Sequence, residues 1–126
     1  MQQDQTRLTL RRTPTEARRA RHYVRDLCAG LSVDVTNTAQ LLTSELVANA
    51  VQHGTGEIEL RVATRDGELH VEVADESPDE PRLLEASPDQ PKGRGIMIVD
   101  AFSSSWGVTP FEDRPGKSVW FVLPTA

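Results

Sequence analysis

The chain has 126 residues, of which 37% are hydrophobic and 26% are charged, and its formal net charge is −5. This describes an ordinary globular protein of one domain, residues 1–126. No apolar run approaches the roughly 18 to 20 residues of a membrane helix, and the start, MQQDQTRLTLRR, has no apolar signal segment, so we expect a cytoplasmic protein without a membrane partner. The acidic balance argues against general nucleic-acid binding, and the single cysteine, Cys28, excludes an internal disulfide and a cysteine metal cluster.

The charge is unevenly distributed along the chain. Residues 1–25 contain seven arginines against Asp4 and Glu16, a balance of +5, which leaves −10 for residues 26–126. A basic N-terminal segment can meet an acidic partner, although each single arginine is more typical of a solvated helix face.

The first elements are a short strand and a helix. The alternation in RLTLRR predicts an edge strand over residues 7–12, within an N-terminal arm of residues 1–13. Thr13 is the expected N-cap of the helix that follows, with Pro14 at its first position. Apolar residues then recur at helical spacing, and Gly30 indicates where the helix stops.

A second helix is predicted from about Asp34 to His53, ended by Gly54. It contains the most apolar run of the chain, yet Glu45, Asn49 and His53 recur every fourth residue and therefore share one side of the helix. Burying a carboxylate or an amide without a partner is costly, so such a stripe lines a cleft, caps another element or faces water. These three residues alone do not decide between an exposed polar edge and a functional site.

Two alternating segments, residues 57–64 and 68–75, predict a β-hairpin, because Asp66-Gly67 between them is the strongest short-range signal for a two-residue turn. Asp75 ends the second strand. A strand-ending aspartate is common as a turn residue and is a weak signal by itself.

Residues 76–94 form a long segment without periodicity that holds four of the eight prolines. Loops of this length are commonly lids or binding loops. Gly93 and Gly95 then open a helix beside Lys92 and Arg94, and the free N–H groups of a glycine-rich helix start favour phosphate.

The chain continues with two strands, residues 106–111 and 117–124. The predicted order is therefore β α α β β, long loop, α β β. We expect an α+β two-layer sandwich, in which a mostly antiparallel mixed sheet carries its helices on one face.

The ordered set of motifs resembles the GHKL (Bergerat-fold, histidine kinase-like) ATP-binding domain, and its short form looks most like the stand-alone anti-sigma-factor serine/threonine kinases of bacteria. The resemblance covers about residues 14–124 and implies a Bergerat fold in which residues 76–94 are the ATP lid. Four segments resemble motifs of the family. ELVANAVQH (45–53) is similar to the N box and DESPD (75–79) to the first glycine box. GRGI (93–96) is similar to the second glycine box and GKSVWFVLP (116–124) to the closing strand.

The resemblance implies a role for each matching residue. Glu45 would be the catalytic base or would orient the attacking hydroxyl, Asn49 would bind Mg²⁺ through the phosphates, and Asp75 would accept a hydrogen bond from the adenine amino group. The other positions implied to bind ATP are His53 at the pocket rim, Ser118 near the adenine, and the lid residues Lys92, Gly93, Arg94, Gly95 and Ile96.

One motif departs from the family pattern. The first glycine box usually reads Asp-x-Gly-x-Gly, and here Ser77 and Asp79 stand in place of both glycines. The departure bears on the flexibility of the lid and on the affinity for ATP.

The resemblance implies an ATP- and Mg²⁺-dependent protein serine/threonine kinase of the anti-sigma-factor type. Its partner would be a STAS-domain antagonist, a sigma factor would be the other ligand, and a homodimer stays open. The alternative is a nucleotide-gated module that regulates a partner without phosphoryl transfer. Glu45 favours the kinase, because binding alone requires no base. An interaction domain without ATP ranks last.

Overall fold

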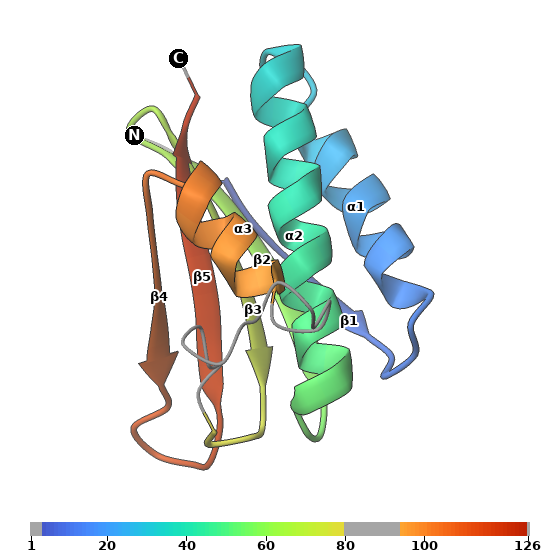
Figure 1. Cartoon of the computed structure of the whole chain (residues 1–126). Coiled ribbons are helices and arrows are strands. Elements are labelled where there is room, and N and C mark those ends of the chain that lie inside the picture. Colours follow the sequence, from blue (N-terminus) through green and yellow to red (C-terminus); the bar gives the residue numbers. More distant parts are fainter. Residues whose placement is uncertain (1–3, 80–93, 126) are drawn as a thin grey trace.

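The computed structural model describes residues 4–79 and 94–125. Figure 1 shows a layer of strands with helices packed on one side. The elements follow in the predicted order as β1 (Asp4–Leu10), α1 (Glu16–Leu27), α2 (Val33–His53), β2 (Ile58–Arg65), β3 (Glu68–Asp75), α3 (Arg94–Phe102), β4 (Ser105–Pro110) and β5 (Lys117–Pro124).

The sheet has five strands in the order β1-β2-β3-β5-β4. All four pairings between these strands are antiparallel, so the described part of the chain has no parallel component and the sheet is not mixed. The predicted α+β two-layer architecture is confirmed, and β1 lies at an edge as predicted. One face of the sheet is covered by helices, and we call the other the helix-free face.

The core lies between α2 and the sheet. Leu42, Leu46 and Val47 of α2 are buried and belong to one apolar cluster with Val71 of β3 and Phe121 of β5. Helical spacing on α2 and alternation on the strands bring these residues to a common interface. The core therefore holds α2 firmly against the centre of the sheet.

The junction of β1 and α1 differs from the prediction. β1 ends at Leu10 because Arg11 and Arg12 leave the sheet: the Arg11 backbone N–H donates to the Glu16 carboxylate at 2.9 Å. α1 begins at Glu16, after a turn in which the Glu16 N–H donates to the Thr13 carbonyl at 3.1 Å. Thr13 is therefore part of a turn and is not the N-cap.

The middle of the chain agrees closely with the prediction. The Ser32 hydroxyl accepts from the Val35 N–H at 3.1 Å and caps α2, and the helix ends at His53 with Gly54 as its C-cap. The turn residues Asp66 and Gly67 have φ of 52° and 76°. This is the pair of positive φ angles that a two-residue type I′ turn requires.

The last elements begin within one residue of their predicted positions. α3 begins at Arg94, so Gly95 lies within its first turn, while Gly93 falls outside the described residues. β4 runs from Ser105 to Pro110, one residue earlier than predicted, and β5 has the predicted bounds. None of the described helices is both long enough and apolar enough to cross a membrane.

Candidate nucleotide site

A polar stripe runs along one side of α2. Gln40 faces α1, because its side-chain amide donates to the Arg21 carbonyl at 3.3 Å. Counted from Gln40 at about 100° per residue, Glu45 and Asn49 lie about 140° and 180° around the helix. Both therefore face away from α1, on the side where α3 packs against α2. His53 is the exposed last residue of the same stripe.

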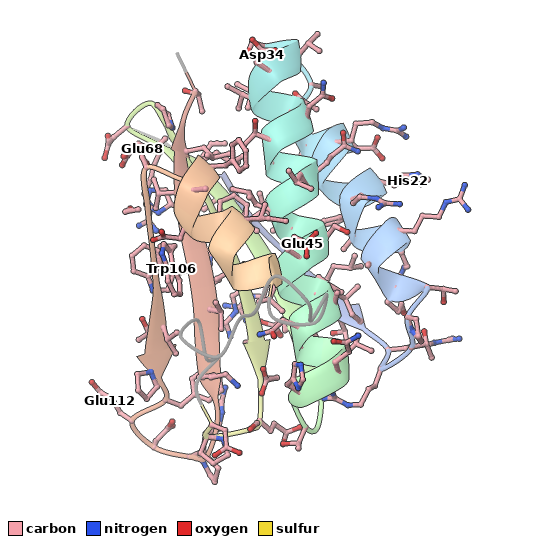
Figure 2. The ribbon with its side chains drawn as sticks, viewed as in Figure 1. His22, Asp34, Glu45, Glu68, Trp106 and Glu112 are labelled. Atoms are coloured by element: carbon pink, nitrogen blue, oxygen red, sulfur yellow. The ribbon has the colours of Figure 1, made fainter. Side chains whose placement is uncertain are left out.

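Glu45 and Asn49 lie at the boundary of the core, where both are half-buried. Burial raises the pKa of the Glu45 carboxyl above its ordinary value of 4.5, because removal from water disfavours the charged form. Figure 2 shows Glu45 midway along α2, at the level of the end of α3 that begins at Arg94. A carboxyl with a raised pKa is better suited to accept a proton than a fully solvated one.

Asp75 lies beside the C-terminal end of α2. It is the last residue of β3 and only 3% exposed. The close approach depends on Gly54, because a Cβ built at that position would lie 2.8 Å from Asp75 Cγ and 2.9 Å from its Oδ2. The structure therefore brings Asp75 together with the His53 end of the stripe, as the prediction of one cleft requires.

The Asp75 carboxylate has a partner that the sequence interpretation missed. Lys117 Nζ lies 3.1 Å from Asp75 Oδ1 and 3.2 Å from Oδ2, and it also donates to the Ser77 carbonyl at 3.2 Å. Both side chains of this ion pair are at most 5% exposed. The sequence of β5 does contain a signal for this position of Lys117. Alternate residues of a strand face the same side, and Lys117 is on the same side as the core residues Val119 and Phe121.

Ser118, which was expected near the adenine, does not share a face of the sheet with Asp75. It pairs with Ala74 across β3 and β5, whereas Asp75 pairs with Lys117. Residues directly opposite in an antiparallel pair share a face and neighbours alternate. Ser118 therefore lies on the helix-free face, and Lys117 takes the position beside Asp75.

The segment after β3 is organised by local hydrogen bonds. The Ser77 N–H donates to Asp75 Oδ1 at 2.8 Å, and the Asp79 N–H donates to the Ser77 hydroxyl at 3.2 Å. These are two consecutive side-chain turns. The Ser77 hydroxyl, which a glycine would lack, thus helps to hold this strand end in a defined turn.

The remaining predicted ATP-binding positions belong to the lid. Lys92 and Gly93 lie outside the described residues, as does most of the segment 76–94. Arg94, Gly95 and Ile96 form the first turn of α3. The backbone N–H groups at a helix start have no intrahelical partner, and together with the helix dipole they favour an anion.

Comparison with known families identifies the chain. A family model described as "Histidine kinase-like ATPase domain" matches residues 10–123, nearly the whole chain. The chain belongs to this family. The match includes the polar stripe of α2, Asp75 and β5, and it agrees with the resemblance in the sequence motifs.

Two solved structures have a similar fold. The RsbU and RsbW domains of Rv1364c from Mycobacterium tuberculosis superpose with a TM-score of 0.73 at 21% identity, covering 96% of this chain and 32% of that one. The histidine kinase domain of the blue-light activated histidine kinase EL346 from Erythrobacter litoralis gives 0.53 at 24% identity, covering 71% and 44%. This chain spans less than half the length of either neighbour. No significant match is found among curated proteins.

An ATPase domain implies ATP binding, and the residues of the site fit this ligand. Asn49 and the N-terminal turn of α3 offer an amide oxygen and backbone N–H groups without intrahelical partners for the phosphate end. Asp75 Oδ2 accepts one hydrogen bond, from Lys117, and a carboxylate oxygen can accept two. Among the described residues, one place therefore remains at Asp75 for an amino group of the base, on an oxygen that it would share with Lys117.

Proposed function

We propose that the protein is a regulatory kinase that uses ATP and Mg²⁺ to phosphorylate a serine or threonine of a protein partner. Its membership of the histidine kinase-like ATPase family supports ATP-dependent chemistry in general. The choice of a hydroxyl as acceptor rests on the resemblance to anti-sigma-factor kinases and on the chemistry of Glu45.

The observation that carries this proposal is the position of Glu45 one turn before Asn49 on the same side of α2. Asn49 would hold Mg²⁺, which typically has few protein ligands and the oxygens of substrate phosphates. Glu45, with its raised pKa, would accept the proton of the incoming hydroxyl. ATP supplies the γ-phosphoryl group, which would become bonded to the hydroxyl oxygen as ADP leaves.

The proposed partner is a STAS-domain protein, with a sigma factor as the other ligand. The RsbU and RsbW domains of the structural neighbour support a setting in anti-sigma-factor signalling. The exposed outer side of α1 carries Arg18 and Arg25, and Figure 2 shows His22 on the same outer side of the helix. This basic surface would favour an acidic partner, mainly through a faster association rate.

A second candidate function is a nucleotide-gated binding module without phosphoryl transfer. The turns at Ser77 and Asp79 favour it, because they hold the strand end where relatives have glycines. The ion pair of Asp75 with Lys117 favours it too, because it engages the carboxylate that would recognise the base. Such a module would bind its partner differently with and without ATP and would leave the partner's mass unchanged.

The test is a phosphoryl-transfer assay read by intact mass. The protein is incubated with STAS-domain proteins of the same genome, ATP and Mg²⁺, and we expect one partner to gain the mass of a phosphoryl group. Glu45→Gln should keep ATP binding and lose roughly 10²- to 10⁴-fold in transfer rate, the usual contribution of a positioned base. Glu68→Gln, the same change on a half-exposed side chain in β3, is the matched control and should leave the rate unchanged. A partner that binds in response to ATP but is never phosphorylated would establish the module instead.

A further inference from the structure

The buried ion pair at the end of β3 has a consequence for the affinity of the site. We propose that Lys117 is an internal competitor of the nucleobase: its ammonium group occupies the carboxylate that the proposed function assigns to the adenine amino group, and so holds the protein in a low-affinity state for ATP. The inference rests on the proposed function in taking Asp75 as the acceptor for the base.

The first argument is that the ammonium group is satisfied within the protein. Lys117 Nζ has three N–H donors and lies within 3.2 Å of three acceptors, which are both Asp75 carboxylate oxygens and the Ser77 carbonyl. It therefore has no donor left for a ring nitrogen of a base unless one of these bonds is given up. Lys117 competes with the base and does not extend the surface that recognises it.

The second argument concerns the acceptor. Asp75 Oδ1 already accepts from Lys117 and from the Ser77 N–H, and Oδ2 accepts from Lys117. Among the described residues, the one place that remains is on Oδ2, so a base that binds there must share this oxygen with the ammonium group. An exocyclic amino group is neutral, and a neutral donor makes a weaker bond to a carboxylate than an ammonium does.

The third argument is burial. The side chains of Lys117 and Asp75 are 5% and 3% exposed, so separating them leaves both charges without water. Breaking a buried pair is costly because of the uncompensated charges. A base that draws the carboxylate away from Lys117 must meet part of this cost, whereas no ion pair has to be separated if residue 117 is uncharged.

The test measures ATP affinity by calorimetry with Mg²⁺ present. Lys117→Met keeps an unbranched side chain and removes the ammonium group. We expect this variant to bind ATP about tenfold more tightly than the wild type. A difference of this size corresponds to one additional hydrogen bond between the protein and the base. Arg65→Met is the matched control, since it removes a positive charge from an exposed residue at the far end of β2 and should leave the affinity unchanged. Adding Asp75→Asn to Lys117→Met should abolish the gain.

A second ligand identifies the contact. Purine riboside triphosphate differs from ATP only in lacking the amino group. The wild type should bind the two nucleotides within about threefold of each other, whereas Lys117→Met should prefer ATP by about tenfold. Thermal melting establishes that each variant is folded. If Lys117→Met does not fold, Lys117→Gln, which keeps a hydrogen-bond donor, should show a smaller gain in the same direction.

The outcomes separate the inference from the proposed function. A wild type that strongly prefers ATP over purine riboside triphosphate, or a folded Lys117 variant that binds ATP equally or more weakly, would overturn the inference and leave ATP binding intact. If neither the wild type nor any folded variant bound either nucleotide, the proposed function would fall together with it.

Discussion

At the scale of single residues, the site depends on two carboxylates in different surroundings. Glu45 is half-buried and its pKa is raised by burial. Asp75 is buried more deeply but is held by an ammonium group and a backbone N–H. A carboxylate with strong donors is suited to fixed recognition, and one without them is suited to proton transfer.

The raised pKa of Glu45 predicts a pH-dependent effect on stability. A carboxyl whose pKa is higher in the folded state favours folding when protonated, and this contribution is lost as the pH rises through the folded-state pKa. The ionised Glu45 therefore opposes folding at neutral pH, and Glu45→Gln should raise the free energy of unfolding there. The gain should shrink as the pH falls and disappear below the ordinary value of 4.5.

The measurement is urea unfolding of both proteins between neutral pH and about pH 4, the range in which glutamate titrates. Glu68→Gln serves again as the control, because its half-exposed carboxyl lies on β3, away from α2. A gain for Glu45→Gln that stayed constant over this range would show that the carboxyl is not destabilised by burial.

At the scale of elements, the end of α2 is fixed by a residue from the other end of the sequence. The Arg12 guanidinium donates to the carbonyls of Ala50 at 2.5 Å and Val51 at 3.3 Å, and to the Gly56 carbonyl at 2.6 Å. The carbonyls at this end of α2 carry the negative end of the helix dipole, and that of Ala50 also accepts from the Gly54 N–H at 2.9 Å. Arg12 thus holds the part of α2 that presents Asn49 and His53.

Arg12→Ala should lower the free energy of unfolding by about 1 to 2 kcal/mol, the scale of charge-assisted hydrogen bonds at a helix C-terminus. Arg12→Lys should recover only part of this, because Arg12 reaches Ala50 and Val51 with Nη1 and Gly56 with Nη2, whereas a lysine has a single nitrogen. Arg11→Ala is the control: Arg11 contacts Glu16 through its backbone N–H, which the substitution keeps. Equal losses for Arg11→Ala and Arg12→Ala would contradict the clamp.

The same arginines show which parts of the fold can be predicted from the sequence. Local signals were sufficient at Gly54 and at Asp66-Gly67, where the structure follows the prediction. They failed at Arg11 and Arg12, which extend the alternation of β1 but leave the sheet. The contacts of Arg12 lie 38 to 44 residues away, and a local pattern does not contain them.

The site divides in a similar way. Glu45, Asn49 and Asp75 were assigned from motif resemblance, and the structure brings Asp75 beside the end of the α2 stripe. Ser118 was assigned from the motif alone, which is read along the chain, whereas the residue that lies beside Asp75 depends on the face of β5. That face is decided by the register with β3, which requires the three-dimensional pairing.

At the scale of the whole molecule, the sheet separates two surfaces of different character. The helix-covered face holds the stripe and Asp75. The helix-free face carries an ion pair between Arg61 and Glu59 at 2.5 Å, a second to Glu72 at 3.2 Å, and a hollow of about 440 Å³ partly lined by His70 and Trp120. The proposed chemistry belongs to the first surface alone, and substitutions such as Glu72→Gln should leave it unaffected.

The central position of β5 predicts how the molecule responds to truncation. β5 is paired with β3 on one side and with β4 on the other, and it supplies Phe121 to the core and Lys117 to Asp75. A chain that ends after Pro110 should therefore show no cooperative unfolding transition by circular dichroism. A truncated chain that unfolded cooperatively would show that β1, β2 and β3 with α1 and α2 are stable without β5.

The strand order also constrains when the protein can fold during its synthesis. β5 is the last of the five strands to leave the ribosome, and until it emerges β4 has no neighbour and β3 is an open edge. Unpaired edges are where nascent chains associate with one another. The protein should therefore depend on chaperones that protect exposed strands until β5 has emerged. The sheet beside Asp75 should be completed only at that point, because β5 pairs with β3 and brings Lys117 to Asp75.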